Sequence, residues 1–272
     1  MKRTKISLNK KLTLDGFSRG SYKTGLRIPE LKIMFDAGVL FESVPHIIFI
    51  THTHIDHVKE LPYILPNENK GIVVIAPKTS TYFIENFINS VHQLSLNIHG
   101  FVFNKYKLIG VEPNNIYDIK IKSCKLRIKT FNMTHDFPCL GYAVYELRKK
   151  LKDEYKQLEG VEIGKLRKQG IQVTELKEFP IIFFSGDTDK EVLHTLPFNE
   201  FKHFIIECTF LLDEDIKCVE TKKHLHYKNL LPYFKQHQDT TFILIHFSLK
   251  YTTEILDDFK NKNSLNNVVF FY

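Results

Sequence analysis

Four side chains that can bind a metal ion fall within six consecutive residues of this chain. They are the histidines and the aspartate of the segment HTHIDH, His52, His54, Asp56 and His57. The apolar run 46–50 directly before them predicts a strand. On extended backbone His52 and His54 point the same way, and Asp56 and His57 follow where the chain turns into a helix. Imidazole and carboxylate together suit zinc or a similar divalent metal, so the segment predicts a metal site more than a histidine-rich surface loop.

Further ligand-type side chains stand at or just past the ends of other apolar runs. They are His135, Asp187 and His246. A single histidine in such a place is more often a hydrogen-bonded edge residue than a ligand. Three such residues beside the 52–57 segment favour strand ends that converge on one pocket, because sites are usually built on loops at the ends of a rigid sheet.

Short apolar runs with strand character alternate with helix-like stretches along the chain. The predicted strands are 26–28, 32–35, 46–50, 71–76, several within 101–130, 181–184, 204–206, 242–245 and 268–271. Helices are predicted over 190–196, 228–236 and 252–260, and over 79–94, where Phe83, Phe87, Ile88, Val91 and Leu94 recur at three-to-four spacing. This layout predicts an α/β protein with helix/sheet/sheet/helix layers. Because the candidate ligands extend from His52 to His246 and must meet, we expect residues 1–272 to form one domain.

Composition excludes several classes of protein. Apolar residues make up 43% of the 272 residues and charged residues 25%, which is ordinary for a globular chain and not for a disordered one. No apolar run is long enough to span a membrane, and the basic first dozen residues do not resemble a secretory signal. The four cysteines are widely spaced, which favours a reduced, intracellular chain. The net charge of +7 and pI near 9.0 suggest a polyanionic partner.

Several segments together resemble the metallo-β-lactamase superfamily and, within it, short-form tRNase Z, the tRNA 3′-processing endonuclease. The segments are DGFS at 15–18, FDAG at 35–38, THTHIDH at 51–57, GY at 141–142 after His135, ECTF at 207–210, HLH at 224–226 and HFSLKY at 246–251. The 51–57 segment alone specifies only the superfamily, and the later segments narrow it to tRNase Z. Lys250 stands where the family usually has Arg.

The resemblance implies the metallo-β-lactamase fold, a four-layer αββα sandwich, and a two-metal site. It assigns His52, His54 and His135 to one metal, and Asp56, His57 and His246 to the other, with Asp187 as the bridge. Two Zn²⁺ ions per subunit are expected, with Mn²⁺ or Mg²⁺ as substitutes. The expected reaction is hydrolysis of a phosphodiester by a metal-bound hydroxide, which removes the 3′ trailer of a precursor tRNA and leaves a 3′-hydroxyl. Asp56 would hold the attacking water. His224, oriented by Glu207, would protonate the leaving oxygen.

Residues 147–179 form a charged segment with few apolar anchors. They carry nine basic residues, among them Lys149, Lys150, Lys165, Arg167 and Lys168, against six acidic ones. Charge alone favours a solvated helical pair. The resemblance instead implies a short, basic form of the exosite arm that grips the tRNA body. Further substrate-contact candidates are Arg19, Lys23, Arg27, Ser248 and Lys250.

Three functions remain open at this stage. The first is the two-zinc endoribonuclease acting on precursor tRNA, which the resemblance implies to be a homodimer; the lack of a long apolar run predicts no membrane partner. The second is another hydrolase of the same fold, acting on a small phosphodiester, thioester or lactone. The third is a catalytically silent RNA-binding protein, although none of the seven ligands is missing. We expect an intracellular and most simply cytoplasmic location, with a nuclear or organellar one also open.

Overall fold

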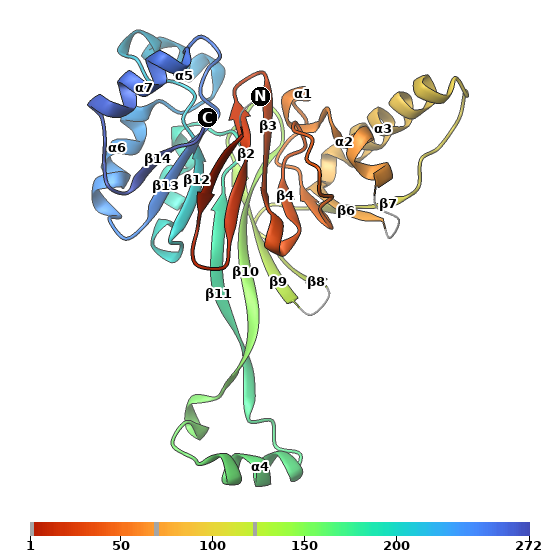
Figure 1. Ribbon diagram of the computed structural model, residues 1–272, viewed down its shortest axis with the longest axis vertical. Helices are drawn as coiled ribbons and strands as arrows, with labels where there is room; N and C mark the ends of the chain where they lie inside the picture. Colours follow the sequence, from red (N-terminus) through yellow and green to blue (C-terminus); the bar gives the residue numbers. More distant parts are fainter. Residues whose placement is uncertain (1–2, 68–70, 122–123) are drawn as a thin grey trace.

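The computed structural model describes residues 3–67, 71–121 and 124–272, and these build two facing β-sheets with helices on both outer faces (Figure 1). The first sheet has the order β1-β2-β3-β4-β5-β6-β7 and the second β14-β13-β12-β11-β10-β9-β8. The first comprises β1 (Thr4–Ser7), β2 (Thr13–Arg19), β3 (Lys23–Ile28), β4 (Ile33–Phe35), β5 (Ile47–Phe49), β6 (Ile72–Pro77) and β7 (Tyr106–Val111). The second comprises β8 (Ile116–Ile121), β9 (Cys124–Met133), β10 (Cys139–Leu151), β11 (Thr174–Phe184), β12 (His203–Glu207), β13 (Thr241–Ile245) and β14 (Val268–Phe270).

Side-chain alternation along the strands separates three apolar layers. In β5, Phe49 faces the core between the sheets, where it stacks on Phe35 at 5.4 Å between ring centroids, whereas Ile48 faces the outer helices. In β13, Ile243 faces the inter-sheet core and Phe242 the opposite helix layer. Since successive strand residues point to opposite faces, such runs are apolar on both sides only when both faces are covered. The predicted αββα sandwich is therefore confirmed.

The outer layers consist of short helices. One layer holds α1 (Ile55–Val58), α2 (Leu61–Ile64) and α3 (Thr81–Leu96); the other holds α5 (Ile216–Lys222), α6 (Tyr227–Gln236) and α7 (Thr253–Lys262). The segment predicted as a helix at 190–196 is a 3₁₀ helix, Lys190–Thr195. In the part of the chain that is described, no helix combines the length and apolar character needed to cross a bilayer.

The burial of α3 differs from the prediction. Ile84 and Ile88 face the core, whereas Phe83 is 64% exposed and Leu94 82% exposed. The three-to-four spacing identified the helix correctly but placed part of the apolar stripe on the wrong face. A repeat of apolar residues reports periodicity, and it cannot tell which of two apolar stripes meets the sheet.

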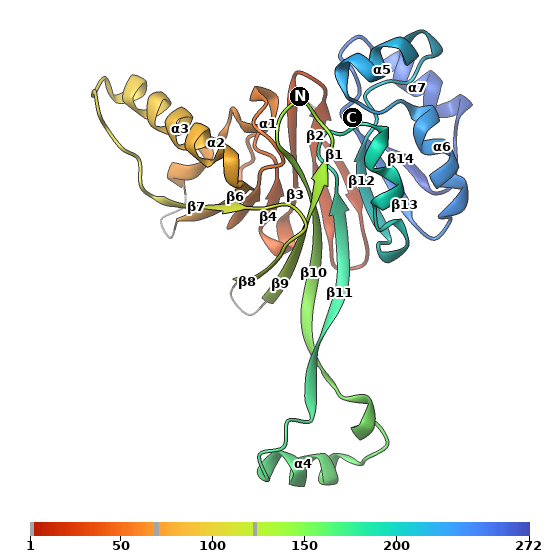
Figure 2. The same cartoon turned by 180° about the vertical axis from the view of Figure 1, so that it is seen from behind.

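Residues 147–179 form an arm that projects from the sandwich (Figures 1 and 2). β10 and β11 continue as a two-stranded antiparallel ribbon whose register runs to Leu151 opposite Thr174. The tip carries a 3₁₀ turn, Asp153–Tyr155, and the helix α4 (Gly160–Lys168). The helical-pair interpretation of this segment is therefore wrong, since both of its ends are strands of a β-ribbon and the tip has the single α-helix α4. Ion pairs between residues close in sequence, such as Lys177–Glu175 and Lys156–Asp153, offset some of these charges.

Candidate metal centre and active site

Strand direction explains why the candidate ligands meet. β4 runs parallel to β5, and β11, β12 and β13 run parallel to one another. β9 and β11 are both antiparallel to β10, so they also share a direction. The residues that follow these strands therefore emerge at one edge of the sandwich. They are Asp36 after β4, His52 after β5, His135 after β9, Asp187 after β11, Glu207 at the end of β12 and His246 after β13.

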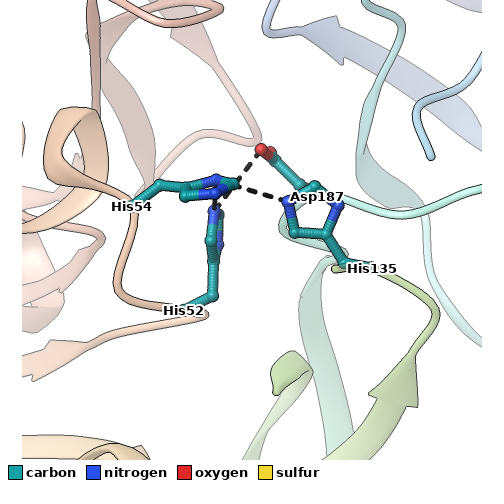
Figure 3. Close-up of side chains that lie close together, drawn as sticks. All are labelled: His52, His54, His135 and Asp187. Carbon is teal, nitrogen blue, oxygen red and sulfur yellow. Dashed lines mark hydrogen bonds and ion pairs between the residues drawn. The ribbon is translucent and has the colours of Figure 1, made fainter. Parts of the chain in front are cut away.

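The first group of ligands is His52, His54, His135 and Asp187, whose ligand atoms all lie within 4.8 Å of one another. Nδ1 of His54 is 3.0 Å from Nε2 of His52 and 3.3 Å from Nε2 of His135. Oδ2 of Asp187 is 3.5 Å from Nε2 of His52. Figure 3 shows the three imidazoles and the carboxylate pointing toward a common centre.

The second group is Asp56, His57 and His246. The Nε2 atoms of the two histidines are 3.4 Å apart, and each lies 3.5 Å from Oδ2 of Asp56. Oδ2 of Asp187 is 3.5 Å from His57 and 3.3 Å from His246, so this carboxylate stands between the two groups. The structure thus brings together all seven sequence-predicted ligands in two clusters that share Asp187.

The burial of Asp187 shows that the clusters suit cations. The residue is 1% exposed, and neither carboxylate oxygen has a hydrogen-bond partner among the described residues. A buried carboxylate without hydrogen bonds is costly unless a cation compensates it. Histidine nitrogens with carboxylate oxygens are the donor set that borderline divalent metals prefer. The site therefore fits divalent metal ions.

The pKa shifts agree with this reading. Burial raises the pKa of the Asp187 carboxyl, but its electrostatic interactions with the neighbouring imidazoles, first His246 and then His57, outweigh burial and hold it well below its usual range. Burial lowers the pKa of His52 and of His54, which keeps both imidazoles neutral and free to donate a lone pair. Around His57 the effect of Asp187 and Asp36 exceeds burial, and its pKa rises to about 10. A metal must displace that proton, so metal binding weakens as pH falls.

Asp36 orients the ligands from behind, and its role was not predicted. Its Oδ2 lies 2.8 Å from Nδ1 of His57, and Thr51 donates backbone and side-chain hydrogen bonds to the same carboxylate. Such a partner fixes which imidazole nitrogen faces the metal. Asp36 has a φ of 55°, in the left-handed region, which is typical of functional positions held by their surroundings. Its place directly after a strand is the same signal that identified the ligands.

His246 is held in a similarly constrained conformation. Its φ is 65°, and Thr209 Oγ1 lies 3.0 Å from its Nδ1. Gly20 packs against the residue: a Cβ there would lie 3.0 Å from the His246 carbonyl oxygen and 3.2 Å from Cε1 of its ring. We infer that a side chain at position 20 would displace this ligand.

His224 and Glu207 form a pair beside the clusters. Nδ1 of His224 lies 2.7 Å from Oε1 of Glu207, which is fully buried and also accepts hydrogen bonds from the backbone of Thr188 and Leu225. Burial lowers the pKa of His224, but the charge and hydrogen bond of Glu207 outweigh it and raise the pKa to about 9. The ring is therefore cationic at neutral pH. Its centroid is 5.2 Å from those of His135 and His246.

The remaining substrate-contact candidates divide by their partners. Arg19 donates to the carbonyls of Phe247, Ser248 and Tyr251, so it holds the loop after β13 in place and is not free for a phosphate. Arg27 pairs with Asp15 at 2.7 Å, and its guanidinium lies 4.3 Å from the Phe41 ring centroid.

Lys23, Lys250 and Ser248 are the other three substrate-contact candidates outside the arm. Lys23 is 3.9 Å from Glu60, and Lys250 pairs with the buried carboxylate of Asp215. Ser248 is half-buried and donates its backbone N–H to Thr209. Lys250 and Ser248 both belong to the loop that His246 begins, at the edge where the metal clusters lie.

The five arm candidates are all exposed. They are Lys149, Lys150, Lys165, Arg167 and Lys168. Lys150 lies 5.5 Å from the Phe179 ring centroid, and the last three occupy the C-terminal half of α4. They sit at the far end of the ribbon from the metal clusters, since β10 starts beside the clusters and runs away from them (Figure 1).

Comparison with known proteins gives the family. No protein-family model matches the chain. Over 252 residues it is 31% identical to the chloroplastic tRNase Z TRZ2 of Arabidopsis thaliana, covering 89% of this chain and 69% of that protein. This chain belongs to the tRNase Z family. The resemblance stated from the sequence is confirmed.

Two solved structures support the fold of this tRNase Z family member. The metallo-β-lactamase fold protein YhfI of Bacillus subtilis superposes with a TM-score of 0.60 at 13% identity, and the human short-form tRNase Z with 0.57 at 16% identity. Each alignment covers 93% of both chains. At these identities they establish the metallo-β-lactamase fold and nothing finer.

Proposed function

We propose that this tRNase Z family member is a two-zinc endoribonuclease that removes 3′ trailers from precursor tRNA. The observation that carries the proposal is the complete set of seven ligands, grouped around Asp187, with the His224–Glu207 pair beside them. When bound, two Zn²⁺ ions would neutralise the phosphodiester and lower the pKa of the attacking water. Mn²⁺ or Mg²⁺ would occupy the same donors. The proposed location is the cell interior, most simply the cytoplasm, because precursor tRNAs are found inside cells.

The protein residues have distinct tasks in this reaction. Burial raises the pKa of Asp56, but the hydrogen bond and charge of His246 together with His57 outweigh burial, so Asp56 is ionised. Its carboxylate can accept a hydrogen bond from the attacking water and aim that water at the phosphorus. His224 then donates its proton to the leaving 3′-oxygen. Because Glu207 occupies Nδ1, the proton donated must be the one on Nε2.

The position of the arm favours a homodimer. The 13 residues of β10 span about 40 Å at the usual rise per strand residue, and they lead away from the clusters. A basic tip at that distance can contact only a part of the tRNA remote from the scissile phosphate, and in the homodimer that the resemblance implies it can present that tRNA to the partner's pocket. We therefore propose that the arm of one subunit grips the tRNA body while the partner subunit cuts the trailer.

Incubation with a precursor tRNA that carries a 3′ trailer tests the function. We expect a cut directly after the discriminator base that leaves a 3′-hydroxyl on the tRNA. Asp56→Ala should abolish the cut. Absence of cleavage with Zn²⁺, Mn²⁺ and Mg²⁺ would refute the proposal and favour a hydrolase of small substrates.

A further inference from the structure

An apolar cavity of about 450 Å³ opens beside the metal clusters. Phe83 and Phe87 of α3, Ile55 of α1 and Phe137 form much of its wall, and no lining residue is charged. Its size lies within the range of small-ligand pockets. The reaction proposed above does not use this cavity.

The cavity adjoins the metal site through shared backbone and one ring contact. Thr53 and Ile55, which line it, alternate with the ligands His54 and Asp56 in the same loop. The ring of Phe137 packs edge-on against His54, with 4.9 Å between centroids and 78° between planes. A ligand in the cavity therefore lies one aromatic ring, that of Phe137, away from His54 of the first metal cluster.

The walls expose apolar surface to solvent, part of it aromatic. Of the aromatic residues Phe83 is 64% exposed and Phe137 50%, and the aliphatic Ile55 is 61% exposed. Contiguous exposed apolar surface at a cavity marks an interaction site. Uncharged walls give no support to a phosphate, whereas aromatic rings are the usual platforms on which unpaired RNA bases stack.

A series of ring contacts leads from this cavity, across the first metal cluster, to the proposed proton donor His224. Phe137 contacts His54, His54 contacts His135, and His135 contacts His224, each at 4.9 to 5.2 Å between centroids. The cavity and His224 thus lie at opposite ends of the first cluster. Since His224 serves the oxygen that leaves with the mature tRNA, the other end suits the nucleotide that stays on the phosphate.

We infer that this cavity binds the base of the first trailer nucleotide, stacked on Phe137 and Phe83. The inference rests on the proposed function and names a specificity site for it. Stacking there holds the scissile phosphate against the clusters and favours purines, which have the larger rings, at the first trailer position. Phe83 and Phe137 act as positioning residues and take no part in proton transfer.

The test combines enzyme variants with base-deleted substrates. One substrate has adenosine at the first trailer position, the second is abasic at that position, and the third is abasic at the discriminator position. The enzymes are the unmodified protein, Phe83→Ser, Phe137→Leu and the control Leu94→Ser, which changes an exposed residue of the same helix that does not line the cavity. Cleavage rate, metal content and oligomeric state are measured for each.

We expect removal of the first trailer base to lower kcat/KM of the unmodified protein about tenfold. Phe83→Ser and Phe137→Leu should lower kcat/KM on the adenosine substrate by a similar factor and on the abasic substrate by less than twofold. Metal content should stay unchanged, and Leu94→Ser should behave as the unmodified protein does.

Three outcomes would overturn the inference while leaving the proposed function intact. In the first, the variants lose the same factor on the adenosine and first-position abasic substrates. In the second, the coupling appears with the discriminator-abasic substrate, which would place the mature end in the cavity. In the third, Phe83→Ser turns a dimer into a monomer with equal losses on all substrates, which would make the cavity a contact with a second copy. No cleavage by the unmodified protein would instead refute the proposed function itself.

Discussion

The metal-ligand pocket and the arm tip differ in how they carry charge: the pocket buries its charged groups, whereas the tip exposes them to water. At the strand-end pocket, Asp187 and His57 are almost entirely buried, and their charges are balanced within the protein or by a metal. At the arm tip, α4 has no buried residue, and its basic side chains face water. Buried charge acts strongly over short distances in a low dielectric, whereas exposed charge acts on a polyanion over a distance set by salt. The pocket is therefore suited to chemistry, and under the proposed function the arm holds the substrate.

The largest expected effect comes from removing the carboxylate shared by the two clusters. Asp187→Ala should lower turnover of precursor tRNA by more than about a thousandfold, because both metals lose a ligand and the charge that attracts them. Metal content by mass spectrometry should fall below two ions per subunit. The control is Asp189→Ala in the same loop, whose carboxylate accepts a hydrogen bond from the Glu191 backbone. Two metal ions per subunit in Asp187→Ala would show that Asp187 is not needed as a ligand shared by the two metals.

The next effect separates proton donation from metal binding within the pocket. His224→Ala should lower turnover of precursor tRNA by about 10² to 10⁴ while both metals remain. The loss should nearly vanish with a nitrophenyl phosphodiester, because nitrophenolate leaves without a proton. His237→Ala, at the other end of β13, is the control. Equal losses on the two substrates would show that His224 is not the proton donor.

Shortening the arm should produce a smaller effect, and the constant that changes should be KM for precursor tRNA. Replacing residues 152–173 with Asn-Gly would close the ribbon between Leu151 and Thr174, which face each other in register. We expect KM for precursor tRNA to rise about 10- to 100-fold, with hydrolysis of the nitrophenyl phosphodiester within twofold of the unmodified protein. Equal losses of activity on precursor tRNA and on the nitrophenyl phosphodiester would show that the arm does not act specifically in binding tRNA.

Charge removal at the tip should give the smallest effect. Changing Lys165, Arg167 and Lys168 to Gln should weaken tRNA binding several-fold, and the slope of log K against log salt should become shallower by about 2 to 3. The matched control changes three exposed lysines of α5, α6 and α7, Lys217, Lys235 and Lys260. An unchanged salt slope in the tip variant would show that these side chains do not meet phosphates.

The sequence was most informative where function requires particular residue types. Ligand-type residues directly after apolar strands identified seven members of the pocket, because parallel strands deliver their ends to a shared edge. The same rule applied to Asp36 would have found the partner of His57. The sequence was least informative at exposed positions. The spacing that identified α3 did not reveal that Phe83 lies on the cavity wall. The charges at 147–179 did not distinguish a β-ribbon from helices.

The sequence by itself determined the chemistry and family of this protein, because metal ligands, strand patterns and motif spacing are local properties of the chain. Only the tertiary structure decided how the parts are used. It placed Asp187 between the two clusters, committed Arg19 to the carbonyls of the loop after β13, and set the arm at the far end of the sandwich from the pocket. The reason is physical: these outcomes depend on contacts between residues distant in sequence, such as Arg19 with Ser248, and no local pattern encodes which distant partner a side chain will meet.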